Sequence, residues 1–294
     1  MEIEIPDVAL GQPAAEEMLA VWLVAGCCFA VSMVITWFAV RRCRQGLPVV
    51  ERRPHDAVPW RGADVAAAVL AFLGLQVLAA EMLPAGASLH ARLAAGSFAM
   101  LAATAVSAGH LWARSKDRGV LGFGLGRLGD DLRLAAAGLG LMLAPLLGLA
   151  AMLDRVVPYR HAIVDFLAAH RDGVSIGLVV FAAVVAAPVA EEFLFRRVLQ
   201  GWLEAWFEPI EPTWGGRAAI VLSSLAFAAA HVGQGLAWVP LFFFGLVVGY
   251  LSRQTGSIVP AIMLHGLFNA VSVGLVLLQT AAPDAGGGGK ASPV

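Results

Sequence analysis

Charged residues are scarce in this sequence. Only 14% of its 294 residues are Asp, Glu, Lys or Arg, whereas about a quarter of an average soluble domain is charged. Since 59% of the residues are hydrophobic and the mean hydropathy is +0.78, a soluble core would lack polar cover. The net charge of −1 provides no basic surface for DNA or RNA. These values argue against a soluble enzyme, a disordered chain and a nucleic-acid binder, and they indicate a polytopic membrane protein.

Cysteine is scarce as well. Cys27, Cys28 and Cys43 are too few for a disulfide framework and lack the spacing of a structural zinc site. The acidic stretch at residues 1–17 has no basic region of the kind that begins a cleavable signal peptide. We therefore expect the first apolar run to remain as a membrane anchor.

Long apolar runs are abundant. A membrane-spanning helix needs about 20 apolar residues, and eight runs are candidates, of which the sixth and seventh are short: 18–40, 63–83, 93–112, 132–153, 174–199, 218–233, 236–251 and 258–278. Many are rich in Ala and Gly, which allow close helix packing in lipid. The sequence predicts an all-α fold, a polytopic membrane helical bundle with about eight transmembrane helices.

The basic residues favour one orientation of these helices. If the N-terminus lies outside, the inside segments contain fifteen Lys and Arg and the outside segments contain five. Cytoplasmic loops carry an excess of Lys and Arg, so we predict that both termini lie outside.

One glycine pattern resembles a dinucleotide-binding motif. Gly124, Gly126 and Gly129 match GxGxxG, but that motif requires a preceding strand and a βαβ unit. Here the glycines lie in an inside loop between two predicted spans. We interpret the segment as a turn at the membrane surface.

Polar residues inside the predicted spans mark the candidate functional site. An ionisable residue costs about 2.5–3.5 kcal/mol to insert into a membrane, so its presence needs a reason. Such residues, with one asparagine, occur in the fifth, sixth and eighth runs: Glu191, Glu192, Arg196, His231, His265 and Asn269.

Helical spacing sorts these residues. Glu192 and Arg196 are four apart, in the favoured order for a salt bridge on one helix face. Glu191 lies about 100° around the helix from Glu192 and should keep a free carboxylate. His265 and Asn269 share a face, since they are also four apart.

The estimated depths allow these residues to meet in the bilayer interior, toward its inner side. A converging Glu, two His and an Asn could activate water and hold an oxyanion. Each residue alone could instead be a packing clamp or a hydrogen-bonded residue of the bundle; several at consistent depth favour a site. The sequence has no HExxH or GxGD motif.

Three motifs, in this order, resemble the pattern of the CPBP (Abi) family, which comprises type II CAAX-prenyl endopeptidases and bacteriocin-processing proteins: Glu191-Glu192-x-x-x-Arg196, Phe227-x-x-x-His231 and His265-x-x-x-Asn269. The resemblance covers about residues 174–278 and implies an all-helical intramembrane endopeptidase. It also implies that Glu192 and Arg196 position the first motif.

The resemblance further implies a mechanism. Glu191 would activate the attacking water with help from His231, and His265 and Asn269 would stabilise the oxyanion. The family is often classed as metalloproteases, because one Glu and two His could hold catalytic zinc. We expect metal-free glutamate chemistry with no cofactor and no metal site, and we keep zinc as the alternative.

The sequence thus predicts a multi-pass protein of the plasma membrane with an N-terminal tail (1–17), N-terminal transmembrane helices (18–153), a CPBP-like catalytic domain (154–280) and a disordered tail (281–294). We expect an intramembrane endopeptidase that hydrolyses a hydrophobic or lipid-anchored peptide, with CAAX-type processing as one option. Its partners would be this substrate and membrane lipid, without nucleic acid. The alternative is a non-catalytic scaffold or regulator that binds partner transmembrane helices. A transporter or proton relay ranks lower, because no inverted repeat is visible.

Overall fold

The computed structural model describes residues 15–115, 117, 119–157, 166–167 and 169–281. All regular structure in these residues is helical, which confirms the predicted fold class. The predicted tails lie outside the described residues, except for 15–17 and 281. The elements are α1 (Ala15–Arg44), α2 (Gly62–Glu81), α3 (Leu89–Ser115), η1 (Gly119–Leu121), α4 (Leu128–Asp154), α6 (Gly173–Val180), η2 (Phe181–Ala186), α7 (Ala187–Glu192), η3 (Phe193–Gln200), α8 (Gly201–Phe207), α9 (Gly215–Ala229), α10 (Trp238–Thr255) and α11 (Val259–Ala281).

Six helices in the described part are long and apolar enough to cross a membrane: α1, α2, α3, α4, the continuous helix Gly173–Phe207 and α11. The other two predicted runs form α9 and α10, which have 15 and 18 residues and pack against each other. They are not among the six, so the bundle has fewer full-length spans than the apolar runs suggested. The chain is nevertheless a polytopic integral membrane protein, as predicted.

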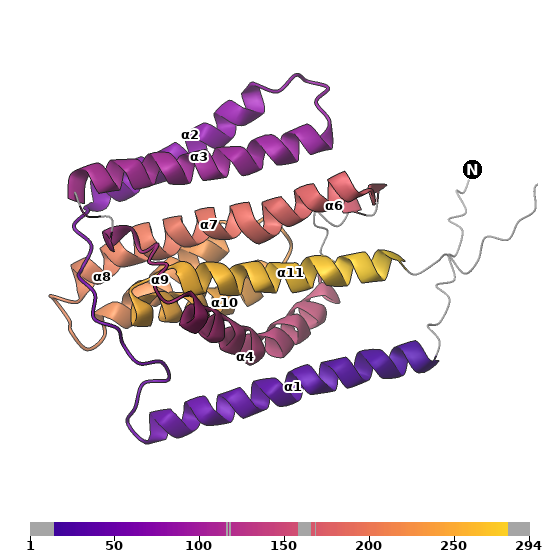
Figure 1. Cartoon of the computed structure of the whole chain (residues 1–294), viewed down its shortest axis with the longest axis horizontal. Coiled ribbons are helices and arrows are strands. Elements are labelled where there is room, and N and C mark those ends of the chain that lie inside the picture. The colour runs from indigo at the N-terminus through magenta and orange to yellow at the C-terminus, as the bar shows by residue number, and fades with distance from the viewer. Residues whose placement is uncertain (1–14, 116, 118, 158–165, 168, 282–294) are drawn as a thin grey trace, which may run out of the picture.

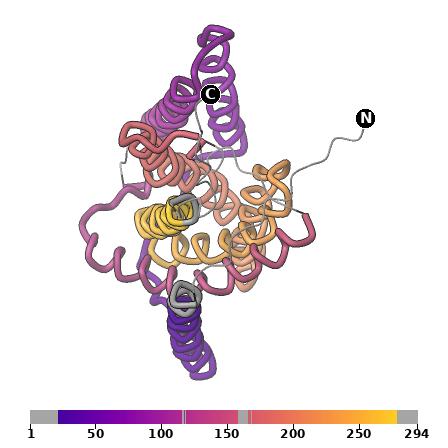
Figure 2. Tube along the Cα trace, turned by 90° about the vertical axis from the view of Figure 1, so that its right-hand side faces the viewer, coloured from indigo at the N-terminus to yellow at the C-terminus, as the bar shows by residue number. Residues whose placement is uncertain are grey.

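The helices form three layers (Figures 1 and 2). The α2–α3 hairpin covers one side of the bundle, α1 covers the opposite side, and the remaining helices lie between them. The hydroxyl of Ser32 on α1 donates to the carbonyl of Leu141 on α4. The buried carboxylate of Asp64 on α2 binds His110 at 3.0 Å and Arg114 at 3.1 Å on α3. The α1 layer thus has a polar attachment to the central helices, whereas the ion pairs of Asp64 join the two helices of the α2–α3 hairpin to each other.

The central helix Gly173–Phe207 is π-helical in η2 and η3, the two stretches that flank α7. Pro188 supplies one reason, since proline has no N–H to donate. In a π-helix, residue 188 would donate to the carbonyl of Ala183, five residues earlier. That carbonyl instead accepts the side-chain amide of Asn269 on α11 at 2.7 Å. The interrupted backbone of the central helix thus becomes the attachment point for α11.

A glycine on α11 permits this close approach. A Cβ atom on Gly266 would lie 2.8 Å from the carbonyl oxygen of Val184 in η2. The Cβ atom would be fixed to the backbone of α11, and the oxygen belongs to the backbone of η2. The clash could therefore be relieved only by moving one of the two helices. Gly266 is one residue after His265, and its contact sets how closely that histidine approaches the central helix.

We expect Gly266→Ala to lower the free energy of unfolding by about 1–3 kcal/mol, the usual cost of overpacking. Gly274→Ala is the matched control on the same helix, because a Cβ there would meet nothing within 4 Å. Thermal unfolding of both purified variants measures the difference. Equal melting temperatures for the two variants would contradict the close contact.

Candidate active site

The two adjacent glutamates of α7 reach opposite ring nitrogens of one histidine on α11. Glu192 Oε1 lies 2.8 Å from His265 Nδ1, and Glu191 Oε2 lies 3.9 Å from His265 Nε2. Successive helix positions point about 100° apart, so the pair approaches the imidazole from two directions. His265 is therefore flanked by a carboxylate on each side.

This arrangement determines what His265 can donate. A carboxylate only accepts hydrogen bonds, so Nδ1 must carry the proton that binds Glu192. A neutral His265 then has no proton on Nε2, the nitrogen nearest Glu191. Nε2 can donate a hydrogen bond only when the ring is a doubly protonated imidazolium. The two neighbouring carboxylates would stabilise the positive charge of that ring.

The two glutamates differ in how fully they are engaged. The predicted salt bridge is confirmed: Arg196 Nε lies 3.1 Å from Glu192 Oε2, and both side chains are fully buried. Glu192 therefore uses one oxygen for Arg196 and the other for His265. The Glu191 side chain is 18% exposed, and its 3.9 Å approach to His265 is longer than a hydrogen bond. Glu191 is thus the carboxylate that can still bind a water or substrate.

A buried polar network holds Arg196 in place. Arg196 Nη1 donates to the hydroxyl of Ser223 at 3.2 Å, and this hydroxyl lies 3.1 Å from Gln200 Oε1. Gln200 Nε2 in turn donates to the carbonyl of Gly249 on α10 at 2.9 Å. The motifs in the sequence did not predict this role for Ser223 or Gln200. Gln200 follows Arg196 by four residues, a spacing that could have suggested it.

The predicted run 218–233 placed His231 in a spanning helix, but it lies in a turn, because α9 ends at Ala229. Its Nδ1 is 2.8 Å from the carbonyl of Phe227, which can only accept, so Nε2 of the neutral ring remains an acceptor. The Phe227 ring lies 4.8 Å from the His231 ring and 6.0 Å from the His265 ring, centre to centre. The buried Phe227 ring therefore contacts both histidines.

Asn269 has a structural contact that its predicted role did not include. Its Nδ2 donates to Ala183 at 2.7 Å and so joins α11 to η2. An amide nitrogen carries two hydrogens, so one N–H remains for another acceptor. Ion pairs join Glu191, Glu192, Arg196 and His265 directly, whereas His231 contacts the group through Phe227, and Asn269 shares α11 with His265.

The donor set does not fit zinc as it is arranged. Catalytic zinc sites usually have three protein ligands about 2.0–2.2 Å from the ion. No three His, Cys, Asp or Glu side chains of the described residues are grouped so that they could hold a metal ion.

Comparison with known proteins identifies the region that contains these residues. Residues 173–271 match the family model described as type II CAAX prenyl endopeptidase Rce1-like. The match includes the central helix and the part of α11 that carries His265 and Asn269. Neither curated proteins nor solved structures gave a match. Residues 173–271 therefore form a domain of the Rce1-like type II CAAX prenyl endopeptidase family.

Proposed function

We propose that this chain is an intramembrane endopeptidase in which Glu191 activates a water molecule for attack on a peptide bond. The proposal rests on a difference between the two carboxylates beside His265. Both oxygens of Glu192 already bind other side chains, whereas Glu191 can still bind a water molecule. Glu192 is fully buried and bound on both oxygens, whereas Glu191 is partly exposed and has no short contact to His265. This division matches a positioning residue beside a general base.

The proposed chemistry uses the space between Glu191 and His265. Their 3.9 Å separation leaves room for an oxygen atom about 2.8 Å from each of the two atoms. The Glu191 carboxylate removes a proton from water, and the water oxygen attacks the carbonyl carbon of the substrate. The protonated Glu191 then transfers that proton to the leaving amine as the C–N bond breaks.

Four neighbouring residues support this step. His231 Nε2 accepts a hydrogen bond from the water and orients it. His265, as an imidazolium paired with Glu192, donates from Nε2 to the oxyanion, together with the second N–H of Asn269. Arg196 holds the Glu192 carboxylate in place through their buried ion pair.

We propose a lipid-anchored peptide as the substrate and the plasma membrane as the location. The family description supports a prenylated substrate that ends in a CAAX sequence. The site lies on spanning helices, where a lipid-anchored peptide can arrive by lateral diffusion in the bilayer.

The test is cleavage by the purified full chain in liposomes. The substrates are a farnesylated peptide ending in a CAAX sequence, the same peptide without the farnesyl group, and a hydrophobic leader-type peptide. We expect cleavage of the farnesylated peptide, with both fragments identified by mass spectrometry. Cleavage of the leader peptide alone would reassign the substrate, and a cellular phenotype rescued by Glu191→Gln would favour a non-catalytic scaffold.

We propose that the reaction needs no bound zinc. Elemental analysis of the purified active chain should find zinc well below one ion per chain, and cleavage should persist after treatment with a chelator and removal of the chelator. One zinc per chain, with activity lost on chelation and restored by the metal, would show that the site works as a metalloprotease.

A further inference from the structure

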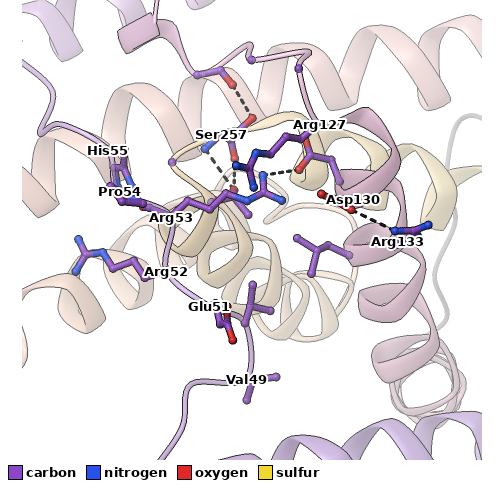
Figure 3. A pocket seen from close by; sticks show the side chains of 18 of the residues that line it. Val49, Glu51, Arg52, Arg53, Pro54, His55, Arg127, Asp130, Arg133 and Ser257 are labelled. Carbon is purple, nitrogen blue, oxygen red and sulfur yellow. Dashed lines mark hydrogen bonds and ion pairs between the residues drawn. The ribbon is translucent and has the colours of Figure 1, made fainter.

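A cavity of about 920 Å³ lies at the end of the bundle that the basic loops predict to be cytoplasmic. It is separate from the candidate active site. Its walls are the segment after α1 at 49–55, the glycine-containing loop before α4, the first turn of α4, and the turn at 255–257 between α10 and α11 (Figure 3). The glycines of the GxGxxG pattern that precede α4, Gly124 and Gly126, therefore lie in the lining of a cavity.

Hydrogen bonds between the segments that form its walls hold the cavity in shape. The backbone N–H of Arg53 donates to the carbonyl of Gln254 at 2.7 Å. The carbonyl of Gly122 accepts the backbone N–H of Ile258 and the hydroxyl of Ser257, both at 3.0 Å. Gly122 has φ of +76°, a conformation that favours glycine. Segments far apart in sequence are thus fixed around one space.

The lining has an excess of positive charge. Five arginines line the cavity: Arg42, Arg52, Arg53, Arg127 and Arg133. Three carboxylates oppose them: Glu51, Asp130 and Asp131. Burial lowers the pKa of His55, so this lining imidazole adds no positive charge near pH 7.

Two arginines differ in their partners. Arg53 Nη1 binds Asp131 Oδ1 at 2.8 Å. Arg127 forms no ion pair within 4.0 Å in the part of the chain that the structure describes, and Figure 3 shows both side chains directed into the same part of the cavity. A guanidinium without a carboxylate partner can bind phosphate with two parallel hydrogen bonds.

Asp131 adds a second requirement for the ligand. It is only 1% exposed, it lines the cavity, and its Oδ2 has no hydrogen-bond partner among the described residues. A buried carboxylate oxygen without a donor is unfavourable. A ligand that fits this lining should therefore combine an anionic group for the arginines with a hydrogen-bond donor for Asp131.

We propose that this cavity binds the headgroup of an anionic phospholipid that carries a hydroxyl group, with phosphatidylglycerol as the simplest example. The phosphate would lie between Arg53 and Arg127, and a glycerol hydroxyl would donate to Asp131 Oδ2. The location supports a lipid, because basic pockets at the cytoplasmic ends of membrane helices lie at the level of lipid headgroups. Val49, Val50 and Leu134 in the lining offer apolar contacts beside the charged groups.

Native mass spectrometry of the full chain in a neutral detergent measures the affinity for individual added lipids. We expect phosphatidylglycerol to bind more tightly than phosphatidylmethanol, which lacks the hydroxyl, and both to bind more tightly than phosphatidylcholine. Arg127→Gln should weaken binding of phosphatidylglycerol about fivefold. Arg217→Gln is the matched control, because Arg217 is exposed and does not line the cavity. Asp131→Asn should remove the preference for phosphatidylglycerol over phosphatidylmethanol.

If Arg127→Gln does not fold, Arg127→Lys replaces it, because it keeps the charge but loses the forked geometry; its affinity should still fall below that of the unmodified chain. Equal binding of phosphatidylglycerol and phosphatidylcholine, or equal effects of the Arg127 and Arg217 variants, would overturn the proposal. Glycerol 1-phosphate offers the same chemistry without acyl chains and should not displace the lipid at equal concentration. Displacement by it would assign the cavity to a soluble phosphate compound instead.

Discussion

Replacing Glu191 with glutamine is expected to lower kcat for peptide hydrolysis by about 10²–10⁴-fold, the usual contribution of a positioned general base. Glutamine keeps the shape of the side chain but cannot accept the proton from water. Because the Glu191 side chain is partly exposed and lies 3.9 Å from His265, its neutralisation removes no short hydrogen bond. We therefore expect the variant to fold and to retain substrate binding, so that KM changes much less than kcat.

The matched control is Glu81→Gln, which makes the same chemical change at the exposed end of α2. Its kcat should equal that of the unmodified chain. Measuring initial cleavage rates over a range of substrate concentrations separates kcat from KM. Equal kcat values for Glu191→Gln and Glu81→Gln would remove Glu191 from the reaction.

Replacing Arg196 with methionine is expected to lower the free energy of unfolding by about 3–5 kcal/mol, because it leaves a buried carboxylate without its partner. Glu192 and Arg196 are both fully buried and lie 3.1 Å apart. The double variant Glu192→Gln/Arg196→Met removes both charges and should recover much of this loss. Both variants should have low activity, since each changes the groups that position His265.

A surface ion pair provides the control for this prediction. Arg133 and Asp130 lie 3.3 Å apart, but their side chains are 85% and 54% exposed, so Arg133→Met should cost no more than about 1 kcal/mol. Denaturant unfolding of the variants in the same detergent gives the free energies. Similar losses for Arg133→Met and Arg196→Met would contradict the special role of the buried pair.

Local spacing predicted the features of the site that lie within one helix. The four-residue separation of Glu192 and Arg196 predicted their salt bridge, and the angular offset of adjacent residues predicted that Glu191 would keep a free carboxylate. The salt bridge is present, and Glu191 comes no closer than 3.9 Å to His265, although both glutamates approach that one histidine. Such features depend only on helix geometry, which a sequence specifies directly.

Contacts between helices could not be predicted in this way. The position of His265 between two carboxylates depends on how α11 packs against α7, and the Asn269 contact depends on an acceptor that the π-helical winding of η2 leaves available. Neither the π-helical stretches nor the end of α9 before His231 has a clear signal in hydropathy. The count of full-length spans differed because two apolar runs form the shorter, packed helices α9 and α10.

Cleavage of a farnesylated CAAX peptide in liposomes by the full chain and by Glu191→Gln, compared in parallel, tests the central claim most directly. Mass spectrometry follows the two fragments over time. We predict that the unmodified chain produces both fragments and that the folded Glu191→Gln variant, at equal protein concentration, produces them at least about 100-fold more slowly. Equal rates of fragment formation by the two proteins would contradict the assignment of Glu191 as the base.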